Sequence, residues 1–150
     1  MGTHAIRRTE KPWGYELLWA RNAGYAGKVL HILKGHRLSL QYHVEKVETI
    51  LVNAGLLLLQ LENERGELEE LNLRPGDACH IPAGRIHRMI ALEECDLMEV
   101  STDQLEDVVR LEDSYGRVAS DGATVETLPY RPTPTHEGHS TLYDAAAALF

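Results

Sequence analysis

Two short stretches of this chain carry side chains whose types and spacing suit metal chemistry. The first holds Gln41, His43 and Glu48, with one and four residues between successive members. The second holds His87, which follows a Pro-x-Gly turn. Amide oxygen, imidazole and carboxylate together form a donor set that borderline divalent metals accept. We therefore predict that Gln41, His43, Glu48 and His87 converge on one divalent ion, with zinc as the first choice and manganese, iron, cobalt or nickel as alternatives.

The stretch over residues 35–43 should present these ligands from one face. If it is extended, its side chains alternate, so that Ser39, Gln41 and His43 share the face opposite the apolar residues between them. A buried polar group without a partner costs about 1–3 kcal/mol, so this face requires partners such as a metal ion. Without Gln41, the two histidines and the carboxylate also match the ligand set of non-haem iron oxygenases.

Short extended segments separated by turn residues fill most of the chain. Residues 1–11 are predicted to form an arm or edge strand, and residues 103–109 a short turn or helix. The predicted strands cover residues 16–19, 25–33, 35–43, 48–53, 56–61, 68–73, 78–81, 86–92, 95–101 and 108–112. Eight to ten short strands with little room for long helices indicate an all-β sandwich or barrel.

Length, composition and charge limit the class of protein. The chain has 150 residues, 43% of them hydrophobic and 25% charged, which fits one globular domain with a substantial core. We expect a barrel with an N-terminal arm over 1–117 and an irregular tail over 118–150, where Pro, Ser, Thr and Gly are frequent. The net charge of −8 argues against nucleic acid as a partner.

No segment of the sequence suggests export or membrane insertion. The N-terminus lacks the apolar stretch of a signal peptide, and the longest Leu-rich run, residues 56–59, is far too short to span a bilayer. The two cysteines, Cys79 and Cys95, are isolated and match no disulfide framework. These features predict a cytoplasmic protein without a membrane partner.

The spacing of the two stretches resembles the two signature motifs of the cupin superfamily. In order, the residues that carry the resemblance are Gly35, Gln41, His43, Glu48 and Gly55, and then Gly76, Pro82, Gly84 and His87. The resemblance implies a double-stranded β-helix, also called a jelly-roll barrel, with a metal bound inside it. Gln41 stands where most cupins have His, and Ala91 where the second motif often has Asn.

A narrower set of motifs is similar to the type II mannose-6-phosphate isomerase domain. The motifs lie at residues 11–14, 38–43, 81–84, 87–88, 98–100 and 109–117. The resemblance implies a metal-dependent isomerase that interconverts aldose and ketose phosphates through an enediolate, with Glu48 or Glu99 carrying the proton. The nucleotide-binding half of the bifunctional isomerase/guanylyltransferase proteins is absent here, so no guanylyltransferase activity is expected. Lys46 replaces a common Arg, and Thr49-Ile50 replaces His-Trp; both changes bear on the substrate.

A sugar phosphate would require basic residues at the mouth of the pocket. The candidates for substrate binding are Lys28, Arg37, Lys46, Arg88 and Arg110. The two motifs are not enriched in basic residues, so composition adds no support for a phosphate site. Two other functions stay open: an iron-dependent dioxygenase that uses His43, Glu48 and His87, and a non-catalytic sugar-binding cupin.

Large apolar residues near the motifs are expected to form the core or a subunit interface. They are Trp13, Trp19, Leu38, Leu40 and Tyr42. An apolar outer sheet face in so short a chain favours self-association, so we expect a homodimer.

Overall fold

The described residues, 5–117, form eleven β-strands and no helix in the computed structural model. The predicted C-terminal tail, 118–150, lies outside the described residues. The described part of the chain contains no helix long and apolar enough to cross a membrane. The strands are β1 (Arg7–Lys11), β2 (Gly14–Arg21), β3 (Ala26–Ile32), β4 (Leu40–Tyr42), β5 (Glu48–Ala54), β6 (Leu57–Glu62), β7 (Leu68–Leu73), β8 (Ala78–Ile81), β9 (His87–Ala91), β10 (Cys95–Ser101) and β11 (Val109–Glu112).

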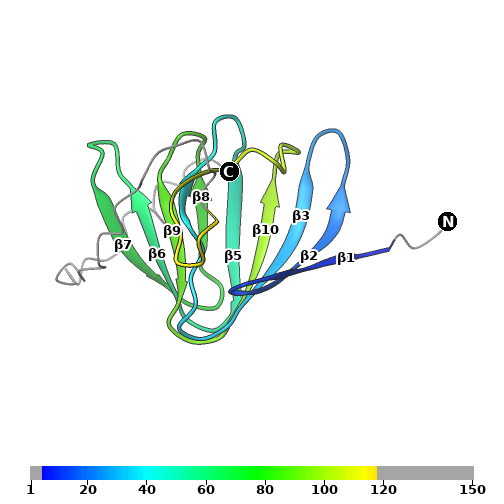
Figure 1. Cartoon of the computed structure of the whole chain (residues 1–150), viewed down its shortest axis with the longest axis horizontal. Helices are drawn as coiled ribbons and strands as arrows, with labels where there is room; N and C mark the ends of the chain where they lie inside the picture. The colour runs from blue at the N-terminus through cyan, green and yellow to red at the C-terminus, as the bar shows by residue number, and fades with distance from the viewer. Residues whose placement is uncertain (1–4, 118–150) are drawn as a thin grey trace.

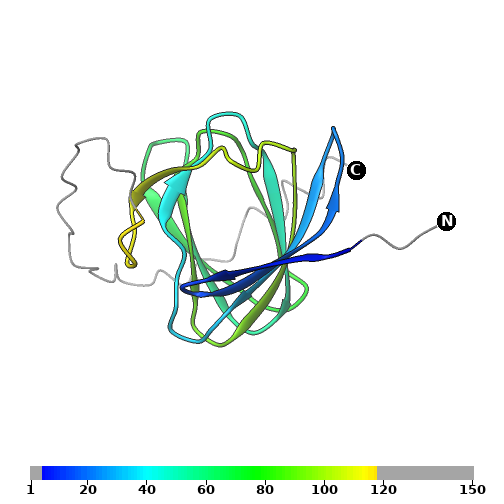
Figure 2. The ribbon, with the colours of Figure 1, turned by 45° about the vertical axis from the view of Figure 1, so that its right-hand side comes forward.

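The strands form two antiparallel sheets that face each other as a barrel (Figures 1 and 2). The larger sheet has the order β1-β2-β3-β10-β5-β8, and the smaller one has the order β11-β4-β9-β6-β7. Strands that are distant in sequence therefore pair with each other: β10 pairs with β3 on one side and with β5 on the other. The all-β prediction is confirmed.

The core lies between the two sheets. Its fully buried side chains come from both of them and include Ile32, Ile50, Leu57, Leu59, Ile81, Met89 and Leu97. Burial of each such side chain contributes about 1.5–3 kcal/mol to folding. Trp13 also belongs to this core, as predicted, whereas Trp19 lies on the outer surface with its ring over Gly27.

Most predicted strands are found within one or two residues of their expected bounds, but the segment over 35–43 is not one continuous strand. Only Leu40–Tyr42 forms β4, and Arg37 makes an isolated bridge to Ile90. Because the backbone before β4 is irregular, the predicted alternation fails at Leu38, whose side chain lines the same cavity as Ser39 and also packs against the core.

The predicted helix or turn before the last strand is a turn. Residues 103–108 form turns in which Leu105 N donates to the Asp103 carbonyl and Asp107 N donates to the Gln104 carbonyl. This connection places Asp107 against the loop that follows β4.

Candidate metal centre

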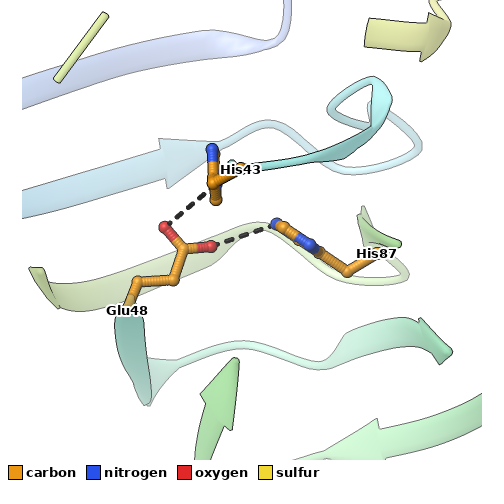
Figure 3. A group of neighbouring side chains, drawn as sticks. All are labelled: His43, Glu48 and His87. Atoms are coloured by element: carbon orange, nitrogen blue, oxygen red, sulfur yellow. Dashed lines mark ion pairs between the residues drawn. The ribbon is translucent and has the colours of Figure 1, made fainter. Parts of the chain in front are cut away.

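Three buried side chains from different strands converge inside the barrel (Figure 3). His43 follows β4, Glu48 begins β5 and His87 begins β9. The Nε2 atom of His87 lies 3.1 Å from one Glu48 oxygen, and Nε2 of His43 lies 3.5 Å from the other. One ligand atom from each residue lies within 4.8 Å of the others. The exposed fraction is 3% or less for all three residues, so water cannot solvate them freely.

Hydrogen bonds determine which imidazole nitrogens face the centre. The Nδ1 atom of His43 lies 2.5 Å from the Asp107 carbonyl oxygen, and Nδ1 of His87 lies 2.9 Å from the Arg85 carbonyl oxygen. A carbonyl only accepts, so each Nδ1 donates to it and each Nε2 is the nitrogen that faces Glu48. A backbone carbonyl that holds Nδ1–H in this way orients a histidine to bind a metal through Nε2.

The atoms that face one another here are of the types that bind a metal. Both Nε2 atoms and both Glu48 oxygens are buried, and the Lys46 ammonium contacts only one of them, Glu48 Oε2, at 2.7 Å. A cation held between the two imidazoles and the carboxylate would satisfy this buried group. Two imidazoles and a carboxylate are the donors that a borderline divalent metal takes, so these residues fit the predicted metal.

The ionisation of Glu48 suits this role. Burial by itself would raise the pKa of the Glu48 carboxyl, but His43, His87 and Lys46 outweigh burial and hold that pKa well below its ordinary range. Glu48 is therefore a carboxylate, which is the form that binds a metal.

Gln41 lies beside the three ligands. Its Cα pairs with that of His87 between β4 and β9 and with that of Arg110 between β4 and β11. Residues directly opposite in an antiparallel pair share a face, so Arg110, Gln41 and His87 form one row across the smaller sheet. Buried Ser39 donates from Oγ to Oε1 of Gln41 at 2.6 Å and orients the amide.

A cavity of about 410 Å³ adjoins the centre and is lined by side chains from both sheets. Its charged lining residues are Arg7, Lys11, Lys28, Lys46, Arg110 and Arg117, with Glu16, Glu48, Glu99 and Glu106. Three of the predicted substrate ligands, Lys28, Lys46 and Arg110, are among them. The other two, Arg37 and Arg88, do not line this cavity: Arg37 donates to Ser114 and Arg88 is paired with Glu112.

Lys46 connects the centre to Glu99. Its Nζ lies 2.7 Å from Glu48 Oε2 and 3.1 Å from Glu99 Oε1. Burial alone would lower the pKa of Lys46, but Glu99 and Glu48 raise it, so the ammonium stays charged. Burial and the charge of Glu48 raise the pKa of Glu99, although Lys46 and Lys28 oppose the shift. The two carboxylates around one ammonium therefore differ in acidity.

The contacts of two residues that support the centre were not predicted from the sequence. Asp107 accepts three backbone N–H groups, from Val44, Glu45 and Lys46, at 2.9, 2.7 and 2.8 Å. Its carbonyl also orients His43. No spacing rule connects Asp107 to a loop about sixty residues earlier. The alternation of side chains put Ser39 on the polar face with Gln41 and His43, but it did not indicate the hydrogen bond from Ser39 to Gln41.

The barrel and its buried His–Glu–His group define a cupin. Residues 2–113 match the family model described as "Mannose-6-phosphate isomerase C-terminal". Since this match covers most of the chain, the protein belongs to the mannose-6-phosphate isomerase C-terminal family. The predicted cupin resemblance and fold are thereby confirmed.

Two curated relatives show a similar level of identity. Mannose-1-phosphate guanylyltransferase ManC from Salmonella typhimurium is 31% identical over 121 residues, which are 77% of this chain and 24% of that protein. Xanthan biosynthesis protein XanB from Xanthomonas campestris pv. campestris is 32% identical over 116 residues, 74% of this chain and 24% of that protein. The chain thus spans about a quarter of the length of the curated relatives it matches.

Solved structures share the fold at low sequence identity. KdgF from Halomonas sp. superposes with a TM-score of 0.59 at 19% identity and covers 69% of this chain and 91% of its own. Oxalate decarboxylase from Bacillus subtilis superposes with a TM-score of 0.62 at 18% identity, over 71% of this chain and 30% of its own. At these identities the likeness establishes the barrel.

Proposed function

We propose that this protein is a metal-dependent sugar-phosphate isomerase of the mannose-6-phosphate isomerase type. The observation that carries the proposal is the buried group of His43, Glu48 and His87 beside a charged cavity of about 410 Å³. Membership in the isomerase C-terminal family supports the same reaction class. Such a cavity is large enough for one small polar molecule.

Four side chains would hold the metal. His43, Glu48 and His87 supply the three buried donors, and Gln41 lies in register with His87 to supply a fourth. A bound divalent ion would act as a Lewis acid that polarises the carbonyl and the neighbouring hydroxyl of an open-chain sugar. Zinc is the first candidate; manganese, iron, cobalt and nickel suit the same donors.

Glu99 is the residue proposed to move the proton between the two sugar carbons. Glu48 is engaged by both imidazoles, which leaves Glu99 as the buried cavity carboxylate outside the ligand set. Its raised pKa lies nearer to neutral, which suits a group that both accepts and returns a proton. Lys46, within 3.1 Å of each carboxylate, holds the two in a fixed relation.

The test compares matched carboxylate variants in metal-loaded protein. Glu48→Gln should lose bound metal by elemental analysis, whereas Glu99→Gln should retain the metal and lose at least about a hundredfold in kcat for hexose-phosphate isomerisation. Glu64→Gln, an exposed change of the same kind, should alter neither property. Metal-replete wild-type protein that isomerises no common hexose or pentose phosphate would contradict the proposal.

A dioxygenase is the second candidate, because the two-histidine, one-carboxylate group alone also matches iron oxygenases. Oxygen consumption with Fe(II) would favour it, since isomerisation consumes no oxidant. Ligand-induced thermal stabilisation without turnover of any kind would instead favour a sugar-binding protein.

A further inference from the structure

Two cations in the cavity wall, exposed Arg7 and half-buried Arg110, make no ion pair among the described residues, and Arg110 is the one that is withdrawn from solvent. Arg110 lines the cavity, and its Nε is buried without a hydrogen-bond acceptor among the described residues. A buried guanidinium N–H without an acceptor is costly, so its retention needs an explanation. A bound anion would provide the acceptor.

The other cavity cations in the interior are engaged. Lys46 lies between Glu48 and Glu99. Lys28 and Lys11 both approach Glu16, at 3.4 and 3.7 Å. Since these cations are paired, Arg110 is, among the described residues, the interior cavity cation that is available to an incoming anion.

The carboxylate whose pKa Arg110 affects, Asp113, is already occupied. Asp113 accepts from Nε and Nη2 of Arg117 at 3.0 and 2.9 Å, each through a different carboxylate oxygen. Burial alone would raise the pKa of Asp113; Arg117, with a smaller contribution from Arg110, lowers it. Arg110 therefore interacts with the Asp113 carboxylate only at longer range, and the two residues form no ion pair.

The position of Arg110 suits a ligand that spans two points. Arg110, Gln41 and His87 pair in register across three adjacent strands, so Arg110 lies two strands from a metal ligand, about 10 Å between Cα atoms. An arginine fork binds phosphate oxygens in a bidentate manner. A molecule held at the metal by vicinal oxygens would reach Arg110 with a group several carbons away.

We propose that Arg110 is the phosphate-binding residue of this cavity and selects substrates that carry a terminal phosphate monoester. The inference rests on the proposed function for the identity of the sugar, but binding of the phosphate does not require turnover. It therefore assigns a substrate-determining role to a residue outside the metal centre.

The test uses sorbitol 6-phosphate, which lacks a carbonyl and cannot be isomerised. Calorimetric titration into metal-loaded protein should give a Kd that rises by at least about tenfold in Arg110→Gln. Arg65→Gln removes the same charge from an exposed turn and should leave the Kd unchanged. Arg110→Lys should recover part of the affinity, because it restores charge without the fork. Metal content should stay at the wild-type level in all three variants.

The outcomes separate this inference from the proposed reaction. Binding of sorbitol 6-phosphate that depends on Arg110, in a protein that isomerises nothing, would support the phosphate site and contradict the isomerase. An active isomerase whose Kd and KM are the same in Arg110→Gln would overturn the site. It would also be overturned by wild-type protein that does not bind the compound, or by equal losses in Arg110→Gln and Arg65→Gln.

Discussion

Asp107 is the residue whose several contacts link the metal centre to a distant loop. Its carboxylate accepts from three successive backbone N–H groups, while its carbonyl accepts from His43. Burial alone would raise the pKa of Asp107, but the backbone donors of Glu45, Lys46 and Val44 outweigh it and lower that pKa. The carboxylate thus positions the loop that carries Lys46, and the backbone carbonyl positions His43.

Replacing Asp107 with Ala should therefore weaken both folding and metal binding. The three N–H groups lose their acceptor, and a free energy of unfolding lower by about 1–3 kcal/mol is expected. Metal affinity should fall because the connection between His43 and Glu48 loosens. Urea unfolding and metal titration measure the two effects.

The matched control is Asp103→Ala. Asp103 pairs only with half-exposed Arg21 at the surface, and such a pair contributes at most about 1 kcal/mol. Equal losses of stability in the two variants, with metal affinity intact in both, would contradict the role given to Asp107.

At the scale of elements, the turns between strands depend on glycines that serve unequal purposes. Gly55 and Gly76 have nearly the same left-handed backbone, with φ of +94° and +96°. A Cβ on Gly55 would lie 2.1 Å from the Glu94 carbonyl oxygen, whereas a Cβ on Gly76 would meet no atom of the described residues within 4 Å. The first turn needs glycine for space and conformation, and the second for conformation alone.

This difference predicts unequal costs for the same substitution. Gly76→Ala should lower the free energy of unfolding by about 1–2 kcal/mol, the cost of a left-handed alanine. Gly55→Ala should cost more than about 3 kcal/mol, because strand β5 or β10 must also move. Chemical denaturation of the two variants gives the comparison, and equal losses would show that the turn at Gly55 yields without strain.

His31 joins neighbouring segments on the outer face of the larger sheet. Its Nδ1 lies 2.7 Å from Asp96, its Nε2 lies 2.6 Å from Glu94, and its ring stacks on Tyr15. Burial by itself would lower the pKa of His31, but Asp96 and Glu94 outweigh it and raise that pKa above 6.5. The protonated imidazole is therefore favoured in the folded protein.

A raised pKa makes the contribution of His31 to stability depend on pH. That contribution is complete below the unfolded value near 6.5 and is lost as pH rises through the higher folded value. His31→Gln should therefore lose up to about 1 kcal/mol at about pH 5.5 and much less at about pH 9. Unfolding free energies of the variant and of His80→Gln, whose partner is Thr49, provide the measurement and its control. A loss that grows with pH would refute the assignment.

At the scale of the whole molecule, the outer face of the larger sheet carries apolar side chains beside the His31–Asp96 pair. One row across its outer face joins Leu17, Val29, Met98 and Leu51 in register over four strands, and half-exposed Val100 extends it. Six strands about 4.8 Å apart and on average about six residues long give a face of roughly 600 Å². That area approaches the roughly 800 Å² per partner of a standard interface, so we expect a second copy of the chain to cover this face.

The expected dimer should separate when charge enters the row. Val100→Arg should give a monomer by sedimentation at micromolar concentration, because two copies of the cation would oppose each other across a two-fold axis. Leu68→Arg, on exposed β7 of the smaller sheet, should remain dimeric. A monomeric wild-type protein would dispose of the prediction.

Much of the fold and the presence of the His–Glu–His group could be predicted from the sequence, because their causes are local. Alternating side chains and turn residues act over a few positions, so most strand bounds were correct. The spacing around His43, Glu48 and His87 indicated their convergence, which the structure shows. The irregular backbone before β4, which places Leu38 in the cavity, depends on pairing with β9 and lay beyond such reasoning.

The spacing of the candidate metal-binding residues and the succession of short strands separated by turns follow from the sequence alone. The tertiary structure alone decided which basic residues face the cavity: Lys28, Lys46 and Arg110 do, and Arg37 and Arg88 do not. It also brought Asp107 to the loop after β4, about sixty residues away in the chain. The physical reason is that pairing between distant strands sets which face of each strand meets the interior, and no local pattern encodes that pairing.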